Sequence, residues 1–521
     1  MIQRTKYIFL ALLLITLVAF SSNANNYIKK LKTLTQVIRL VNENYVEEVD
    51  MNDVLDGAII GLLDKLDPHS SYLSVELLEE MQENFSGEFE GIGIEFSIID
   101  GYITIISPIP ETPSDRAGLL SGDKIVKING ESAYKITQKD VFNKLRGPKN
   151  SKVNITIRRG GVDDFDVALI RAKIPIHSLL ASFMIDNETG YVKINRFSHT
   201  TIDEFKDALD DLEQLGMSQL MIDLRNNPGG LMNQAVQMID MFIDSRDKIL
   251  FTKGRIRGSS RDEWSSRSVT DKKYPVIVLI NRGSASASEI VAGALQDLDR
   301  GLVVGETSFG KGSVQNLLEL NDGSAIKLTI AKYYTPSGRS IQRPYDKGVD
   351  EYYLDLNEDN RESLDSLDND SPVFKTKSGR TVYGGGGITP DIFVESDMKL
   401  SKSISLFITS TDRLLFNFSE KIKNDNSMNE YLKSNSINEF INNYKLSSNY
   451  KKDLTVILEE LDDEFIKEHL NQDWNFIENR IKAQIANSIW GKSAMYQVNL
   501  KMDKVAMDAL EQFPSARLLI K

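Results

Sequence analysis

The sequence contains no cysteine and only four histidines among its 521 residues. Without cysteine, the chain has no disulfide, no thiolate zinc site, no iron–sulfur cluster and no cysteine nucleophile. The histidines His69, His177, His199 and His469 are not spaced as ligands on one helix, which argues against a multi-histidine metal site. If the protein is a hydrolase, we therefore expect its general base to be a residue other than histidine.

Basic residues are also in the minority. The chain has 62 Lys and Arg against 75 Asp and Glu, which gives a net charge of −13. This balance argues against wholesale nucleic-acid binding, which needs basic patches to displace counterions. The hydrophobic content of 41% is enough to bury real cores. The length predicts about three domains, at roughly 150 residues each.

An apolar run near the N-terminus, residues 7–20, has 14 residues, fewer than the ~20 needed to cross a bilayer as a helix. Arg4 and Lys6 precede the run, and small polar residues around Ala24 follow it. This order predicts a secretory signal peptide, residues 1–24, cleaved after Ala24. Retention of the segment as an N-terminal membrane anchor is the alternative. In both cases we expect the rest of the chain to lie outside the cytoplasm, in the periplasm or cell envelope.

Hydrophobic spacing divides the remaining chain into four regions. Residues 27–85 have helical spacing, residues 86–173 are β-rich, residues 174–395 alternate strands and helices, and residues 396–521 are polar and helical. The alternation in the third region predicts an α/β layer with a largely parallel sheet. We therefore expect a multidomain protein of the α/β (α+β) class.

The same spacing predicts individual elements. The expected strands are 98–106 (a pair turned at Asp100-Gly101), 124–128, 153–158, 191–194, 219–224, 276–280, 302–304 and 314–320. The expected helices are 138–145, 201–215, 231–242, 286–295 and one whose apolar face runs from Leu454 to Ile466.

Residues 350–370 are acidic and lack a pattern, which predicts a surface loop. Asp355, Asn357 and Asp359 within it imitate a calcium-binding loop. The turn glycine and the closing glutamate of such a loop are both replaced, so we expect no calcium there.

Three serines, Ser284, Ser286 and Ser288, alternate with alanine directly after a predicted apolar strand, where a helix begins. A hydroxyl at this position lies beside the free N–H groups of the helix and the positive end of its dipole. Helix capping would explain one such serine. Three serines with small neighbours leave room for another molecule to approach, so each of them is a candidate nucleophile.

Lys311 lies in a glycine-rich segment, Gly305–Ser313, that imitates a phosphate-binding loop. The nucleotide interpretation fails because Gly312 occupies the position of the metal-binding hydroxyl and a strand, rather than a helix, is expected next. Apolar strands are predicted on both sides of the segment. A lysine placed between them loses hydration, which lowers its pKa and lets it act as a base.

Two further glycine motifs could bind an oxygen anion through backbone N–H groups. Gly229 and Gly230 follow a predicted strand, where such groups can form an oxyanion hole, although an ordinary turn has the same sequence. The second motif could cradle a carboxylate and is followed by a strand whose edge could pair with a peptide; its residues are Gly91, Ile92, Gly93 and Ile94.

Taken together, these motifs resemble those of the C-terminal processing (tail-specific) serine peptidases, a family with a PDZ domain. The resemblance covers roughly residues 30–395. The matching segments are 67–70, 116–119, 122–123, 223–230, 283–289, 310–315, 334–338 and 384–390. The resemblance implies a ClpP/crotonase-like α/β peptidase core at residues 174–395 with an inserted PDZ-like domain at residues 86–173.

The resemblance also implies catalytic roles. It selects Ser286 as the nucleophile, Lys311 as the base 25 residues later, and Gln315 as the residue that orients the lysine amine. The backbone N–H groups expected to hold the oxyanion are those of Gly229 or Gly230 and of Ala287. For Lys311 to be neutral, its pKa must fall about three units from ~10.4, which costs about 4 kcal/mol.

The partners implied are protein or peptide substrates with a free, apolar C-terminus, whose carboxylate would bind near Gly91–Ile94. Arg146 is a candidate for coupling the PDZ-like domain to the core, although a surface role is the simpler interpretation. We expect no nucleic acid, no cofactor and no metal. The N-terminal segment would place the protein near a membrane if it is retained. The helical tail is compatible with a homo-oligomer and equally with an ordinary packed domain.

The main alternative is a binding or scaffold protein with a PDZ-like module and a degenerate hydrolase core. The presence of all three implied catalytic side chains argues against it.

Overall fold

The structure is a computed structural model. It describes residues 26–244, 246–266, 270–346, 348–349, 352, 371–395, 400–410 and 412–520. The predicted signal peptide and most of the acidic loop, including its calcium-like residues, lie outside the described residues. Within these ranges, no helix has the length and apolar character needed to cross a membrane.

The chain divides into two compact units, residues 1–72 and residues 73–521. In the first unit, residues 26–44 and α2 (Met51–Leu63) are helical, as predicted. The N-cap of α2 is Asp50, whose side chain accepts a hydrogen bond from the backbone N–H of Asn52. The short strand β1 (Ser71–Leu73) then interrupts the predicted helical region.

A six-stranded sheet forms the centre of the second unit, in the order β10-β11-β12-β15-β16-β21. The strands are β10 (Leu179–Met184), β11 (Thr189–Ile194), β12 (Gln219–Asp223), β15 (Val276–Ile280), β16 (Leu302–Gly305) and β21 (Ile392–Phe393). The pairs from β11 to β21 are parallel, and only β10 is antiparallel to its neighbour. The prediction of a largely parallel sheet is therefore confirmed.

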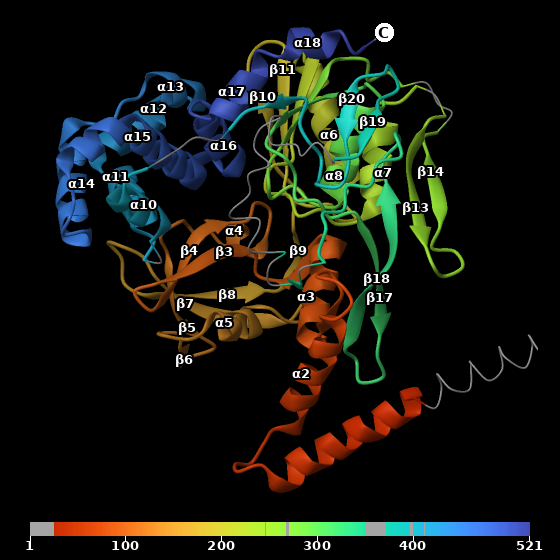
Figure 1. Ribbon diagram of the computed structural model, residues 1–521. Coiled ribbons are helices and arrows are strands. Elements are labelled where there is room, and N and C mark those ends of the chain that lie inside the picture. Colours follow the sequence, from red (N-terminus) through yellow and green to blue (C-terminus); the bar gives the residue numbers. More distant parts are fainter. Residues whose placement is uncertain are drawn as a thin grey trace, which may run out of the picture. The chain divides into compact units, whose positions relative to one another are not determined.

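Helices cover both faces of this sheet (Figure 1). One layer contains α6 (Thr201–Gln214), α7 (Met232–Asp240) and α8 (Ala287–Asp297). The opposite layer contains α16 (Lys492–Leu500), α17 (Lys504–Leu510) and α18 (Phe513–Arg517). β15 explains why both layers are needed, because its sequence Val-Ile-Val-Leu-Ile is apolar on both faces and fully buried.

Antiparallel strands form a second sheet beside the central one. Within it, β18 (Ala325–Tyr334) pairs with both β17 (Ser313–Glu319) and β13 (Lys248–Gly254), and β13 pairs with β14 (Arg261–Trp264). Of these four strands, the sequence analysis predicted only β17. β17 matters for the site because it begins two residues after Lys311.

The β-rich region is a sheet in the order β3-β4-β5-β7-β8, with β6 (Glu131–Ser132) paired to β5. The strands are β3 (Ile94–Ile99), β4 (Tyr102–Pro108), β5 (Lys124–Ile128), β7 (Lys152–Arg158) and β8 (Phe165–Ile170). The helices α4 (Pro113–Arg116) and α5 (Gln138–Leu145) accompany the sheet. β2 (Glu88–Gly91) and β9 (Ala172–Pro175) pair at the entry and exit of the region. α3 (Val75–Ser86) leads into β2. The predicted strands and helix of this region are confirmed.

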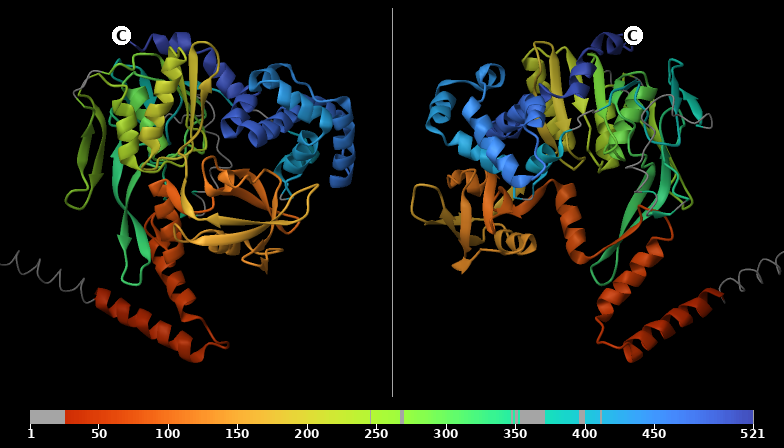
Figure 2. Two further views of the ribbon diagram at one scale, coloured as in Figure 1. Left: turned by 180° about the vertical axis from the view of Figure 1, so that it is seen from behind. Right: turned by 60° about the vertical axis from the view of Figure 1, so that its left-hand side comes forward.

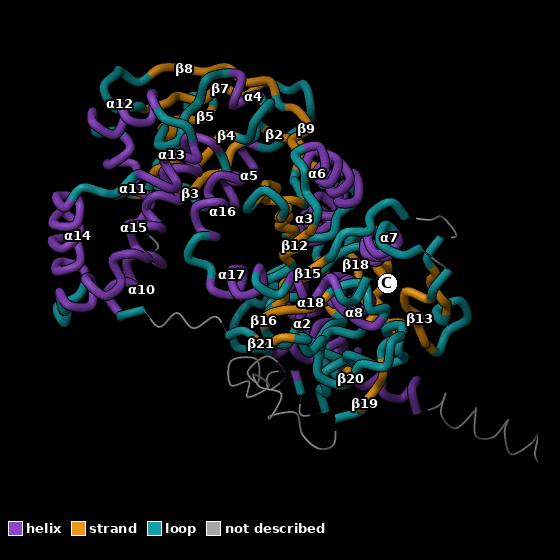
Figure 3. Tube along the Cα trace, turned by 90° about the horizontal axis from the view of Figure 1, so that it is seen from above, coloured by secondary structure: helices purple, strands orange, loops and turns teal. Residues whose placement is uncertain are grey.

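A group of six helices follows the central sheet. Its members are α10 (Lys402–Thr409), α11 (Leu414–Lys423), α12 (Asn426–Ser434), α13 (Ile437–Asn443), α14 (Ser448–Leu461) and α15 (Lys467–Trp490). Together with Ala494 and Val498 of α16 they enclose a second apolar core, and they stand apart from the central strands in Figure 3. They lie next to the β-rich region in both views of Figure 2. The hydroxyl oxygens of Ser488 on α15 and Ser121 in the β-rich region are 3.3 Å apart. The prediction that the α14 helix continues to Ile466 was wrong, because the chain becomes extended at Asp462.

Candidate active site

The three alternating serines have different surroundings. Ser284 and Ser288 are fully buried, and their hydroxyls donate to the carbonyl oxygens of Leu224 and Asn227, both at 2.9 Å. These two serines therefore fix the start of α8 to the segment that follows β12. Ser286 is the N-cap of α8 and lines a cavity of about 660 Å³.

The backbone of Ser286 is in an unusual conformation, with φ 55° and ψ −112°. Residues with a Cβ seldom adopt a positive φ, and such a conformation costs about 1–3 kcal/mol. The N–H of Ser286 donates to Glu289 Oε2 at 2.8 Å. The sharp turn between β15 and α8 thus presents Ser286 at the cavity at the expense of local strain.

The fully buried carboxylate of Glu289 joins the serine to the lysine segment. Its Oε1 accepts hydrogen bonds from Ser308 Oγ at 2.6 Å and from the N–H of Gly310 at 2.7 Å. Its Oε2 accepts from the N–H of Ser286 and, at 2.9 Å, from the N–H of Lys311. Burial raises the pKa of Glu289 and outweighs the four donors, which lower it. The sequence analysis gave Glu289 no role, although the Ser-x-x-Glu spacing of a capping box was a signal for it.

Lys311 lies between β16 and β17, half-buried, and lines the same cavity as Ser286. Its Nζ donates to Gln315 Oε1 at 2.9 Å. The hydroxyl of Tyr333, on β18, lies 2.9 Å from the carbonyl oxygen of Lys311 and 3.1 Å from that of Ser286. The structure therefore brings together the three side chains to which the sequence analysis assigned catalytic roles; the roles themselves stay predictions.

Two of the three predicted oxyanion residues have backbone N–H groups available. The N–H of Gly229 donates to Asn227 Oδ1 at 2.9 Å and is therefore engaged. Within the described part of the chain, the N–H groups of Gly230 and Ala287 donate no hydrogen bond. Gly229 has another function: a Cβ there would lie 2.7 Å from the Cβ of Ser286, so only glycine permits this approach.

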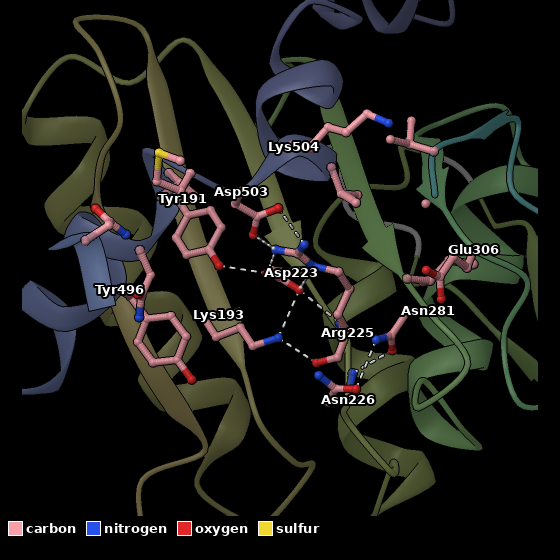
Figure 4. Close-up of a pocket in the computed structure, with 18 of the residues that line it drawn as sticks. Tyr191, Lys193, Asp223, Arg225, Asn226, Asn281, Glu306, Tyr496, Asp503 and Lys504 are labelled. Atoms are coloured by element: carbon pink, nitrogen blue, oxygen red, sulfur yellow. Dashed lines mark hydrogen bonds and ion pairs between the residues drawn. The ribbon is translucent and has the colours of Figure 1, made fainter. Parts of the chain in front are cut away.

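A buried charge network anchors the beginning of the segment that contains Gly229 and Gly230 (Figure 4). Asp223 accepts from Tyr191 Oη at 2.7 Å, Lys193 Nζ at 2.9 Å and the Arg225 guanidinium at 2.6 Å. Burial alone would raise the pKa of Asp223, but Arg225 and Lys193 hold it well below its usual range. Arg225 also binds Asp503, just before α17, through two hydrogen bonds of 2.6 and 2.9 Å.

These residues line a second cavity of about 350 Å³ between the carboxyl ends of the central strands and the helices α15 to α17. The C-terminal helices thus contact the segment that leads to the proposed catalytic cavity.

The predicted carboxylate-binding segment, Gly91–Ile94, connects β2 and β3 and does not line the catalytic cavity. Ile92 lies in the core of the β-rich region, and its carbonyl oxygen accepts from the N–H of Ser114 at 3.0 Å. Gly93 has φ +86°, and a Cβ there would lie 2.3 Å from Thr112 Oγ1. The sheet order places β3 at an edge, where a peptide strand can be added.

Arg146, at the end of α5, connects the β-rich region to α3. Its guanidinium lies 4.8 Å from the ring centre of Phe89 and 4.6 Å from that of Phe142, and it pairs with Glu83 on α3. Phe85, on the same helix, lines the catalytic cavity. The partner of Arg146, Glu83, is thus adjacent in the chain to Asn84, which also lines the cavity.

Comparisons with known proteins agree with this arrangement. Residues 188–351 match peptidase family S41, residues 104–159 match the PDZ domain, and residues 16–77 match the activating protease CtpB N-terminal domain. The fold and these matches define a serine-type peptidase with a PDZ domain.

Named relatives make the assignment more specific. The chain is 39% identical over 328 residues to the carboxy-terminal-processing protease of Bartonella bacilliformis, covering 62% of this chain and 75% of that protein. It is 37% identical over 321 residues to the carboxy-terminal processing protease CtpA of Bacillus subtilis, covering 61% and 68%. The structure of the photosystem II D1 C-terminal processing protease is similar at 25% identity with a TM-score of 0.36, covering 69% of this chain and 92% of that one. The chain belongs to the carboxy-terminal processing proteases of family S41.

Proposed function

We propose that the protein hydrolyses peptide bonds with Ser286 as the nucleophile and neutral Lys311 as the general base. One observation carries this proposal: Ser286 and Lys311 line one cavity, and the single carboxylate of Glu289 holds the backbone N–H of both. Gln315 accepts a hydrogen bond from the lysine amine and so fixes its direction.

The proposed reaction has two halves. Ser286 Oγ attacks the scissile carbonyl carbon while its proton moves to Lys311 Nζ. The N–H groups of Gly230 and Ala287 donate to the oxyanion, each contributing about 3 kcal/mol to the transition state. Lys311 then returns the proton to the leaving amine, which departs and leaves an acyl-enzyme. Water, deprotonated by Lys311, hydrolyses the acyl-enzyme by the same steps.

Substrate selection in this proposal depends on the β-rich region. A substrate tail adds to the edge of β3, and N–H groups of Gly91–Ile94 receive its terminal carboxylate. Apolar end residues are proposed because the implied family acts on such tails. Three observations support the peptide site: the PDZ match, the edge position of β3 in its sheet, and the ion pair of Arg146 with Glu83 on α3, the helix whose Phe85 lines the cavity.

A cleavage assay tests the catalytic pair. The full-length mature protein and its Ser286→Ala and Lys311→Ala variants are incubated with an unfolded protein that ends in apolar residues, and fragments are followed by mass spectrometry. Lys332→Ala is the control, because Lys332 is an exposed lysine on β18 outside the cavity. We expect fragments from the parent and from Lys332→Ala only. Undiminished cleavage by Ser286→Ala or Lys311→Ala would refute the pair. Equal rates on a C-terminally amidated substrate would refute carboxylate recognition.

We further propose that the protein is exported and loses residues 1–24. The basic residues, the 14-residue apolar run and the small residues near Ala24 support this proposal. N-terminal sequencing of the protein from a cell-envelope fraction should begin at Asn25. An intact Met1 in that fraction would instead indicate a retained membrane anchor.

A further inference from the structure

The charge of the catalytic cavity is one-sided. Arg196, Lys311 and Lys327 line it, and none of its described lining residues is Asp or Glu. The remaining walls consist of uncharged residues, among them Phe85 and Ile290. The chain as a whole has a net charge of −13, so this local excess of cations is opposite to the general composition.

Lys327 lies close to the proposed catalytic lysine because of the strand register. On the β17–β18 pair, Gln315 is opposite Thr329, and Leu317 is opposite Lys327. Residues two apart on a strand point to the same face and are separated by about 7 Å. Lys327 is therefore on the face of Gln315, about two residue positions along the strand.

The ammonium group of Lys327 has no counter-charge among the described residues. Its side chain makes no hydrogen bond or ion pair with them, although the residue is half-buried. Burial lowers its pKa, with no carboxylate to oppose the change. A half-buried ammonium group without an acidic partner is unfavourable in the free protein and gains when an anion enters the cavity.

Arg196 lines the same cavity and also has no acidic partner among the described residues. It follows β11, and its guanidinium donates to Asn84 Oδ1 on α3, a neutral group. No carboxylate among the described residues pairs with it, and burial lowers its pKa. A guanidinium can bind a carboxylate through two parallel hydrogen bonds, whereas the ammonium of Lys327 acts as a point charge.

We propose that Lys327, with Arg196, forms a subsite that binds a carboxylate of the substrate about two residues from the scissile bond. The inference rests on the proposed function, because it assumes that substrate occupies this cavity. It names the substrate class: peptides with a carboxylate close to the cleaved bond. That carboxylate is either an Asp or Glu side chain or the terminal group of a tail cleaved very near its end.

Binding to the Ser286→Ala variant tests the subsite without hydrolysis. Four fluorescent peptides share one sequence around a bond that the parent cleaves. The second residue after the scissile bond is either Glu or Gln. The peptide ends one residue later, with either a free carboxylate or an amide, which gives the four combinations. Their affinities are measured by anisotropy with Lys327 intact, with Lys327→Met, with Lys327→Arg and with the exposed control Lys332→Met. Thermal unfolding verifies that each variant is folded, and Lys327→Gln replaces Lys327→Met if the latter is not.

With Lys327 intact, we expect the peptide with the recognised carboxylate to bind about tenfold more tightly than its neutral counterpart, and the ratio to fall as salt rises. Lys327→Met should reduce this ratio to about one, while Lys327→Arg and Lys332→Met should preserve it. If Lys327→Met abolishes the difference in affinity between the Glu and Gln peptides, the subsite binds a side-chain carboxylate. If it abolishes the difference between the free and amidated peptides, the subsite binds the terminal carboxylate. Any contribution of the PDZ domain to peptide affinity is the same with and without Lys327, because Lys327 lies outside that domain, so it cancels when the variants are compared.

Ratios that Lys327→Met leaves unchanged, or that Lys332→Met reduces equally, would overturn the subsite. Failure of the proposed function looks different: the Ser286-containing protein would cleave no peptide, or Ser286→Ala would cleave as well as the parent.

Discussion

Replacing Glu289 by glutamine should loosen the segment that carries Lys311 without removing either the serine or the lysine. The buried carboxylate accepts two hydrogen bonds on each oxygen, and the donors Ser308 and Gly310 are themselves buried. An amide has only one accepting oxygen, so its NH2 group must face two of these donors. The most favourable arrangement directs NH2 toward Ser308, whose hydroxyl can turn, and leaves the N–H of Gly310 without a partner.

A buried donor without a partner costs about 1–3 kcal/mol, and we expect the free energy of unfolding of Glu289→Gln to fall by this amount. We expect the variant to lose more in catalytic rate than in stability. Gly310 directly precedes Lys311, so loss of its hydrogen bond to Glu289 should let the lysine shift. A displacement of about 1 Å between reacting groups can cost about 100-fold in rate, so we expect kcat to fall about 100-fold with little change in KM. Hydrolysis of a fluorogenic peptide and urea unfolding followed by circular dichroism measure the two quantities. Glu459→Gln, on the exposed face of α14, is the matched control for loss of one charge.

The pH dependence gives the same experiment a second readout. Burial raises the pKa of Glu289 above its ordinary 4.5, so the native state favours the protonated form relative to the unfolded chain. The contribution of Glu289 to stability is therefore fully present below about pH 4.5 and decreases as pH rises through the folded pKa. Glutamine does not titrate, so the stability difference between parent and variant should shrink as pH rises. A variant with kcat within threefold of the parent would refute the positioning role of Glu289.

Three further expectations concern neighbouring residues. Ser286→Gly should be more stable than Ser286→Ala by about 1 kcal/mol and should therefore unfold at a higher temperature, because glycine adopts φ 55° without strain. The reverse order of unfolding temperatures would show that the turn is unstrained. Asp503→Asn should lower the free energy of unfolding by about 1 kcal/mol or more, because Arg225 loses a bidentate partner, and Asp508→Asn on the same helix should have little effect in the same melting assay. The pKa of Asp223 is held below its ordinary 3.8, so the contribution of this carboxylate to folding stability is present above about pH 4 and is lost as pH falls. The free energy of unfolding should therefore fall less steeply with decreasing pH in Asp223→Asn than in the parent. Identical pH curves for the two proteins would contradict this.

The sequence correctly predicted those helices and turns that depend on residues close together in the chain. The turn at Asp100-Gly101 and the helix α5 lie where their sequences indicate. The strand β18 also has a local signal, the alternation of apolar residues with Lys327 and Thr329, which the sequence analysis did not use. Its partner β13 is about 70 residues away in the chain, and no local pattern reports such a pairing.

Long-range contacts explain the remaining differences. The helix α14 ends at Leu461 rather than Ile466 because Asp462 binds a distant residue, accepting from Ser403 Oγ at 2.7 Å. Within the site, family resemblance predicted Ser286 and Lys311 as a pair, and the structure places both at one cavity, while their catalytic roles stay predictions. The engagement of the Gly229 N–H by Asn227 depends on three-dimensional loop geometry, and the sequence offered no way to choose between Gly229 and Gly230.

The late position of α17 and α18 in the chain has a consequence for biosynthesis. One face of the central sheet, which includes Tyr191, Met221 and Ile277, packs against apolar residues between Leu500 and Ala516. The strands of that face are synthesised some 200 to 300 residues before the helices that cover it. Until residue 516 has emerged, the sheet has an uncovered apolar face and Arg225 lacks Asp503, so an interrupted chain is an aggregation-prone intermediate. The last helices thus complete the protease core, and chain termination before them should yield insoluble protein.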